Sequence, residues 1–213
     1  MRIGVLGSGT VGTTLAGGFL AHGHEVTIGS RDPEKLRAWA QKHPGARVAT
    51  PEETAKFSEI AVLAVKGTAA AAMLRAAGAQ NLAGKPMIDA TNPIADAPPV
   101  NGVFRFFTSL DDSLMERLQK EFPQIRFVKA FNSVGSARMV NPVYAEGRPT
   151  MFICGNDQPA KDLVARLLDQ LGWDAEDMGG VEAARAIEPL CMLWCIPGLL
   201  HNQWTHAFKL LKP

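Results

Sequence analysis

The sequence has little net charge and no long apolar segment. Its 22 lysines and arginines balance 21 aspartates and glutamates, which leaves a formal charge of +1 at pH 7. A chain of this kind has no overall field that would attract nucleic acid or an anionic membrane. The longest apolar candidate, residues 190–200, contains Pro197 and is shorter than the roughly 18 residues that a membrane span needs. We therefore expect no nucleic-acid partner and no membrane partner.

Cysteine is also scarce. The three cysteines are an odd number, and Cys191 and Cys195 would share one face of a helix as free thiols. This pattern predicts no disulfide, and His201 and His206 do not have the spacing of a helical zinc pair, so no metal site is expected. The first apolar run leads directly into a glycine turn, so we expect no signal peptide. These features favour a cytoplasmic location.

A glycine motif stands near the start of the chain. Gly7, Gly9 and Gly12 form a G-x-G-x-x-G pattern between an apolar strand pattern at residues 1–6 and a helical pattern. In this context Gly7 makes the tight turn, Gly9 lets a pyrophosphate approach the backbone, and Gly12 lets the helix pack close to the strand. The free N–H groups at the start of the helix would bind the phosphates. The motif predicts a dinucleotide-binding site.

The end of the second expected strand indicates which dinucleotide is bound. An NAD-binding site usually carries an acidic residue there, which binds the ribose 2′-hydroxyl. Here Ser30 and Arg31 occupy that place, and Lys35 follows one helical turn later. A hydroxyl and two cations suit a 2′-phosphate, whereas Asp32 is expected to cap a helix that starts at Pro33. We therefore predict NADP(H) rather than NAD.

Strand patterns alternate with helical patterns along the whole chain. This alternation predicts an α/β fold with a doubly wound, mainly parallel sheet. We assign residues 1–178 to the NADP-binding domain and residues 179–213 to a small C-terminal helical region. Strands are expected at 1–6, 24–29, 46–49, 59–65, 85–90, 125–131, 149–154 and, as a short edge strand, 174–178. Helices are expected at 13–21, 34–42, from 51, at 68–77, 111–122, 158–171 and 182–211, the last kinked or interrupted at Pro189 and Pro197.

Ligands of such folds bind beyond the carboxyl ends of the strands. Two of the loops expected there should flank a nicotinamide, with Asn92 and Asn132 as polar groups and Val134 against the ring. Hydride transfer needs alignment more than an acid or base, and we assign no catalytic residue. Lys66 either contacts a ligand or is a surface lysine. Lys129 lies inside a strand pattern and is expected to extend its ammonium group outward to solvent.

Several short stretches spread over the chain carry a family resemblance. They are RIGVLG at 2–7, GSRDPEK at 29–35, IDATNP at 88–93, VKAFN at 128–132 and MFICGND at 151–157. Together they resemble the NADPH-dependent reductases of the deazaflavin coenzyme F420, the NADP oxidoreductases. The loop that begins at Val128 is also similar to the soluble NADPH-binding domain of the STEAP metalloreductases.

The resemblance implies a Rossmann-type domain that binds NADPH for hydride transfer to a flavin-like ring. It also implies that Ser30, Arg31 and Lys35 hold the 2′-phosphate. Asn132 departs from archaeal members of the family, which carry a histidine in this loop. Three functions remain open: an NADPH-dependent reductase of a deazaflavin or flavin, an imine or carbonyl reductase of the pyrroline-carboxylate type, and a non-catalytic NADP(H)-binding sensor.

The expected partners are a small-molecule redox acceptor and a second copy of the chain. Residues 187–211 carry apolar side chains on too many faces for one exposed helix, which predicts a homodimer. The predicted cofactor-binding residues are Gly7, Ser8, Gly9, Thr10, Val11, Gly12, Ser30, Arg31, Lys35, Ala64, Val65, Lys66, Asn92, Pro93, Asn132 and Val134.

Overall fold

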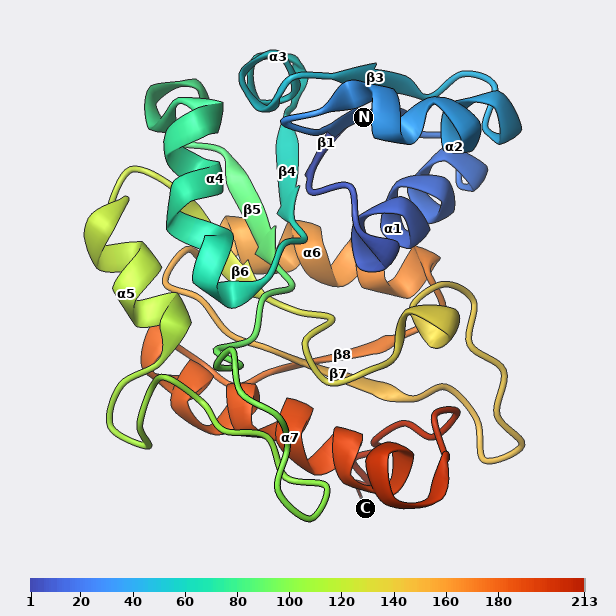
Figure 1. Ribbon diagram of the computed structural model, residues 1–213, viewed down its shortest axis with the longest axis vertical. Coiled ribbons are helices and arrows are strands. Elements are labelled where there is room, and N and C mark those ends of the chain that lie inside the picture. Colours follow the sequence, from blue (N-terminus) through green and yellow to red (C-terminus); the bar gives the residue numbers. More distant parts are fainter. Residues whose placement is uncertain (213) are drawn as a thin grey trace.

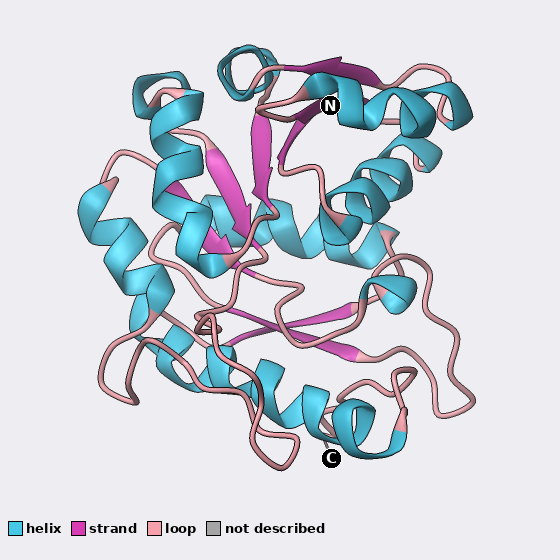
Figure 2. Cartoon of the chain, viewed as in Figure 1, coloured by secondary structure: helices cyan, strands magenta, loops and turns pink. Residues whose placement is uncertain are grey.

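A six-stranded parallel sheet organises the molecule (Figures 1 and 2). The computed structural model describes residues 1–212. The strands run in the order β3-β2-β1-β4-β5-β6, which is the doubly wound arrangement that the alternating pattern predicts. Their bounds are Arg2–Leu6 for β1, Glu25–Gly29 for β2, Arg47–Ala49 for β3, Ile60–Leu63 for β4, Pro86–Asp89 for β5 and Arg126–Lys129 for β6.

Helices cover both faces of this sheet, so the central strands are apolar on both sides. In β4, Ile60 and Val62 belong to one buried cluster, and Ala61 and Leu63 belong to another. The first cluster includes side chains of α1 (Thr10–Ala21) and α6 (Gln158–Gln170). The second includes side chains of α3 (Pro51–Phe57), α4 (Ala70–Ala77) and α5 (Leu114–Glu121). The two cores fix the sheet between its helices.

Two strands lie outside the main sheet. β7 (Thr150–Ile153) and β8 (Asp174–Asp177) pair with each other in a separate parallel sheet. A single antiparallel bridge between Lys129 and Cys154 connects this pair to the end of β6. The expected edge strand near 174–178 therefore exists, but β7 is its partner.

Two expected helices are shorter than the sequence patterns suggest. Residues 33–36 form a 3-10 turn, and α2 covers only Arg37–Lys42. The helix expected from 111 begins at Leu114, because Ser113 caps it: the Ser113 hydroxyl accepts from the Glu116 N–H at 3.1 Å, and the Glu116 carboxylate accepts from the Ser113 N–H at 2.9 Å. This reciprocal capping fixes where α5 starts.

The C-terminal helix ends earlier than expected. After a 3-10 turn at 181–183, α7 spans Ala184–His201 and continues through Pro189 and Pro197. Asn202 stops it in the left-handed region, with φ of +56°, and Trp204 folds back so closely that a Cβ on Gly198 would lie 2.3 Å from its ring. The prediction of helix to residue 211 is therefore wrong.

The residues after α7 form an extended tail that returns to β7. Thr150 donates its backbone N–H to the Phe208 carbonyl at 2.9 Å. The division of the chain at residue 178 stays a prediction, and Pro213, the last residue of the proposed C-terminal region, lies outside the described residues.

The segment Val181–His201 is long and apolar enough, by length and composition, to cross a membrane, although no such segment is expected from the sequence. It contains a buried glutamate, Glu188, and its side chains Ile187 and Trp194 belong to the buried clusters of the protein. Through these contacts the helix packs against the rest of the fold, along the lower edge of the molecule in Figure 1.

Candidate functional site

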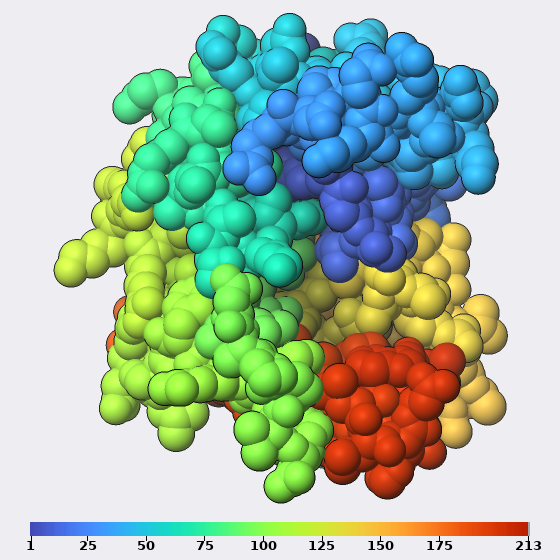
Figure 3. Space-filling model, viewed as in Figure 1, coloured from blue at the N-terminus to red at the C-terminus, as the bar shows by residue number. Residues whose placement is uncertain are grey.

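The carboxyl ends of the strands surround a cavity of about 780 Å³. Its wall is built from the glycine loop, the turn after β2, the segment from the end of β4 into α4, the residues after β5, and residues 94–97. On the face seen in Figure 3 the surface is hollowed between the blue N-terminal segments, the teal α4 region and the green segment that follows β5. A cavity at this place is where nucleotide ligands bind in doubly wound folds.

The glycine loop has the geometry that a phosphate group needs. Gly7 adopts φ of +134°, and a Cβ there would lie 2.2 Å from the Ala64 carbonyl oxygen. A Cβ on Gly12 would lie 2.0 Å from the Gly7 carbonyl oxygen, so Gly12 serves the close packing of helix on strand. A Cβ on Gly9 would meet no described atom within 4 Å. Gly9 thus leaves open space at the N-terminus of α1, where N–H groups and the helix dipole favour an anion.

The turn after β2 presents a hydroxyl and two cations to the same cavity. Ser30 is buried, and its hydroxyl accepts from the Asp32 N–H at 3.1 Å and donates to the Asp32 carbonyl at 2.9 Å. Arg31 and Lys35 are exposed on the cavity wall. Asp32 stands at the expected capping position, but its side chain makes no capping bond and instead approaches Lys35 at 3.6 Å. The turn therefore carries one net positive charge from these three ionisable side chains.

The residues after β5 form a hairpin rather than the plain loop that their proline and asparagine content suggests. Ala95 donates its N–H to the Arg105 carbonyl at 2.8 Å, and Phe107 donates to the Pro93 carbonyl at 2.9 Å. Asn101 and Gly102 both have positive φ at the tip, as a two-residue hairpin turn requires. The hairpin places Asp96 Oδ1 3.9 Å from the Nζ atom of Lys66, which follows the end of β4.

Most of the predicted cofactor-binding residues lie on the cavity wall. They are Gly7, Ser8, Gly9, Thr10, Val11, Ser30, Arg31, Lys35, Ala64, Val65, Lys66 and Asn92. Gly12, Pro93 and Asn132 lie behind the wall, and the Val134 side chain packs into the core with only 7% of its surface exposed. The predicted contact between Val134 and a nicotinamide face therefore stays a prediction, and this side chain faces the core in the structure.

A further part of the wall was not predicted from the sequence. Ala72 and Met73 of α4 face the cavity, as do Ala69 directly before this helix and residues 94–97 of the hairpin. The available signal was the position of α4 directly after the β4 end, since the first turn of such a helix borders the ligand crevice in this fold.

Two asparagine amides meet at the β5 and β6 end of the cavity. Asn92 Nδ2 donates to the Asn132 backbone carbonyl at 2.9 Å, and Asn132 Nδ2 donates to the Ile187 carbonyl at 2.8 Å. The Oδ1 atoms of both asparagines are buried and have no hydrogen-bond partner among the described residues. A buried acceptor without a partner is costly, and Asn92, unlike Asn132, lines the cavity, so its oxygen fits a ligand that carries an N–H donor.

Three charged side chains are buried beneath that end of the site. Lys129 is fully buried, which corrects the expectation that its ammonium reaches solvent. Its Nζ lies 2.7 Å from Asp89 Oδ2 and 2.9 Å from Glu188 Oε1. Burial alone would lower the pKa of Lys129, but the two carboxylates outweigh that effect and hold its pKa above the ordinary value. We call Asp89, Lys129 and Glu188 the buried charge network.

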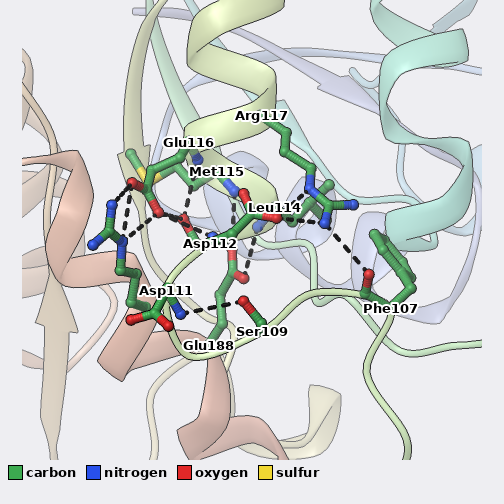
Figure 4. Close-up of polar contacts among 11 residues, drawn as sticks. Phe107, Ser109, Asp111, Asp112, Leu114, Met115, Glu116, Arg117 and Glu188 are labelled. Carbon is green, nitrogen blue, oxygen red and sulfur yellow. Dashed lines mark hydrogen bonds and ion pairs between the residues drawn. The ribbon is translucent and has the colours of Figure 1, made fainter.

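The buried charge network joins three elements. Asp89 and Lys129 are cross-strand neighbours at the ends of β5 and β6, and Glu188 belongs to α7. The Glu188 carboxylate also accepts from the Leu114 N–H at 2.9 Å and the Met115 N–H at 3.0 Å, at the N-terminus of α5 (Figure 4). A carboxylate is stabilised there by the free N–H groups and the helix dipole.

Other ionisable groups offer little chemistry. Burial raises the pKa of the Cys154 thiol to about 12, so it is not a nucleophile at neutral pH. Within residues 1–212 no group of three or more His, Cys, Asp or Glu side chains is placed to hold a metal ion.

Known proteins similar to this chain are redox enzymes. Residues 2–93 match the family model described as NADP oxidoreductase coenzyme F420-dependent. The chain is 34% identical over 208 residues to the F420-dependent NADP reductase of Methanothermobacter marburgensis, an alignment that covers 91% of this chain and 90% of that protein. It is 31% identical over 204 residues to metalloreductase STEAP3 of Rattus norvegicus, which covers 93% of this chain but only 39% of the metalloreductase.

A crystal structure of a protein from Arthrobacter sp. FB24, provisionally assigned as an F420-dependent NADP reductase, has the same fold. The TM-score is 0.92 at 38% sequence identity, and both chains are covered completely. These likenesses confirm the family resemblance predicted from the sequence. With the cavity, the glycine loop and a match along nearly the whole archaeal reductase, they show that the chain belongs to the family of coenzyme F420-dependent NADP oxidoreductases.

Proposed function

We propose that the protein transfers a hydride between NADP(H) and a deazaflavin or flavin-type acceptor. The observation that carries the proposal is one continuous cavity that joins a phosphate-binding glycine loop, a cationic turn and a polar amide end. These are the three contacts that the pyrophosphate, the 2′-phosphate and the nicotinamide of NADPH require.

The cofactor assignment rests on charge. Ser30, Arg31 and Lys35 offer donors to a 2′-phosphate, and no carboxylate pairs with Arg31 in the described part of the chain. Asp32 engages Lys35 rather than standing alone on the wall. An NAD-type site would instead present a free carboxylate to the ribose.

The acceptor assignment rests on the chemistry of the wall near the amide end. Ala90, Asn92, Ile94 and Ala95 form that part of the wall, and none of them can donate or accept a proton at neutral pH. The ionisable side chains beside them, Lys66 and Asp96, pair with each other at 3.9 Å. Hydride transfer between two stacked rings needs alignment rather than proton transfer, whereas reduction of a carbonyl or imine needs a nearby acid. The wall therefore favours a ring acceptor, as does the name of the archaeal relative.

The experiment is NADPH oxidation, followed by stopped flow, with a panel of acceptors: coenzyme F420, FMN, FAD, a ferric chelate and a cyclic imine. The proposal expects fast oxidation with a deazaflavin or flavin and none with the imine. Turnover with the imine alone would favour an imine reductase. Tight NADPH binding without oxidation by any acceptor would favour a non-catalytic sensor.

A further inference from the structure

We propose that Lys129 and Glu188 are positioning residues that hold the Asn92 side-chain oxygen for the carboxamide N–H of a bound nicotinamide. The inference rests on the proposed function, because it assumes an NADP(H) site. It assigns a role to charged residues that do not line the cavity. It also gives the C-terminal helix a part in cofactor binding.

The orientation of the Asn92 amide is settled by its neighbour. Its Nδ2 lies 2.9 Å from the Asn132 carbonyl oxygen, and only a donor can face a carbonyl. The Oδ1 atom must therefore point elsewhere, and it is buried without a partner among the described residues. Asn92 lines the cavity, and a ligand amide that reaches this covered oxygen would supply the donor that it lacks.

The buried charge network holds the backbone on both sides of the amide pair. Lys129 Nζ donates to the carbonyl of Thr91, the residue before Asn92, at 3.0 Å. Glu188 directly follows Ile187, whose carbonyl accepts from Asn132 at 2.8 Å. The ion pair between Lys129 and Glu188, at 2.9 Å, connects these two contacts.

These contacts of the buried charge network explain why charges are buried at the end of an apolar sheet. Asp89 Oδ1 accepts from both the N–H and the hydroxyl of Thr91, at 2.9 and 2.6 Å. With Lys129 on its carbonyl, Thr91 is bonded at three of its polar groups. A residue next to the ligand is thus fixed without any exposed bond. Rigid support of this kind is what preorganises a binding group.

The test compares ligands that differ at one end. NADPH carries the carboxamide, its acetylpyridine analogue replaces the carboxamide by a methyl ketone, and adenosine 2′,5′-bisphosphate lacks the ring altogether. Calorimetry on the wild-type protein should show NADPH binding about tenfold tighter than the acetylpyridine analogue, the value of one good hydrogen bond. In Asn92→Leu that difference should disappear, while the affinity for the bisphosphate stays unchanged.

The buried charge network is tested by the variant Glu188→Gln. The glutamine amide cannot accept all the hydrogen bonds that the Glu188 carboxylate accepts from Leu114, Met115 and Lys129. We expect its NADPH affinity and its preference over the acetylpyridine analogue to fall, again with unchanged bisphosphate affinity. Glu116→Gln is the matched control: Glu116 also binds α7, through Arg185 at 3.0 Å, but lies outside the network. Glu116→Gln should leave all three affinities unchanged.

Two results would overturn the inference while NADPH binding itself survives. One is equal binding of NADPH and its acetylpyridine analogue by the wild-type protein, which needs no variant. The other is a Glu188→Gln protein that loses affinity for NADPH and for the bisphosphate by the same factor, since that marks a general structural effect. A wild-type protein that binds neither NADPH nor the bisphosphate would overturn the proposed function itself.

Discussion

Two glycines of the G-x-G-x-x-G motif have opposite surroundings, and substitutions there should separate folding from binding. A Cβ on Gly12 would meet the Gly7 carbonyl oxygen at 2.0 Å, whereas a Cβ on Gly9 would meet no described atom within 4 Å. We expect Gly12→Ala to lower the free energy of unfolding by about 1–3 kcal/mol, as overpacking does. Gly9→Ala should cost less than about 1 kcal/mol, the loss of a good N-cap residue.

NADPH binding should be affected more by Gly9→Ala than by Gly12→Ala, the reverse of the order expected for stability. In Gly9→Ala the methyl group would occupy space on the cavity wall, so we expect NADPH affinity to fall about tenfold or more, which corresponds to about 1.4 kcal/mol. Urea unfolding and NADPH titration of both variants check the pair. A Gly9→Ala protein that binds NADPH normally would show that phosphates do not approach this loop.

The choice of cofactor should depend on Arg31. Its guanidinium is exposed on the wall beside the buried Ser30 hydroxyl. We expect Arg31→Ala to weaken NADPH binding about 10- to 100-fold through loss of a charge-assisted hydrogen bond, with NADH binding almost unchanged. The matched control is Arg37→Ala, which removes a nearby exposed cation that pairs with Glu34 at 3.0 Å. Equal loss of both cofactors in Arg31→Ala would mark Arg31 as structural.

At the residue scale, local patterns identified the glycine loop and the turn after β2, which lie on the cavity wall, but not the contacts beneath the amide end. Glycine spacing and the charges after β2 are local features, and the residues that carry them line the wall. The role of Lys129 depends on Asp89 in the neighbouring strand and on Glu188 in the last helix. The available signal was a charge inside each of two apolar strands of a covered sheet, where charges are stable only when paired.

At the scale of elements, the junction between α5 and α7 should respond to acid. Hydrogen bonds from Arg185, with those from Ser113, hold the pKa of Glu116 below its ordinary value of 4.5. Because the folded-state pKa is the lower one, the stability that Glu116 contributes is present above the ordinary value and is lost as the pH falls through the folded-state value. Glu116→Gln should therefore be less stable than the wild type near neutral pH, and the difference should shrink in acid.

Chemical denaturation of both proteins at a series of pH values measures this difference. Lys56 and Glu52, which pair on the exposed surface of α3 at 2.6 Å, provide a control: Glu52→Gln should change stability little at any pH, as exposed pairs do. If the stability difference between Glu116→Gln and the wild type stayed constant down to about pH 3, where carboxylates are largely protonated, the account would be contradicted.

Helices and strands of the sheet were predictable because their hydrophobic periodicity is strong. The hairpin after β5 was not, since its strands are held by only a few hydrogen bonds and its sequence resembles a loop. The C-terminal tail was taken for helix because it is as apolar as α7. Its actual course depends on tertiary contacts, namely Trp204 against Gly198 and the tail against β7, which no local pattern contains.

For the whole molecule, we expect a two-fold dimer that forms through α7. Leu193 and Leu200 lie seven residues apart on this helix and are 55% and 51% exposed. Gly102 at the hairpin tip contacts Leu200, and a Cβ there would lie 2.8 Å from it, so Val100 and Val103 beside it extend the apolar surface. Exposed apolar surface of this kind is typical of protein interfaces.

Light scattering at micromolar concentration should give the mass of a dimer for the wild type and of a monomer for the double variant Leu193→Glu, Leu200→Glu. Leu110→Glu changes an exposed leucine on another loop, 77% exposed, and should leave the dimer intact. A monomeric wild-type protein would exclude this arrangement.

The central claim is direct hydride transfer between NADPH and a ring acceptor, and isotope transfer tests it most directly. NADPH deuterated on the transferring side of its nicotinamide would be oxidised by the protein with coenzyme F420 in unlabelled water, without oxygen, and the reduced deazaflavin analysed by mass spectrometry. The account predicts one deuterium in the reduced deazaflavin, because a hydride that passes directly from one ring to another does not exchange with water. Reduced deazaflavin without deuterium from either labelled form of NADPH, or no reduction at all, would contradict it.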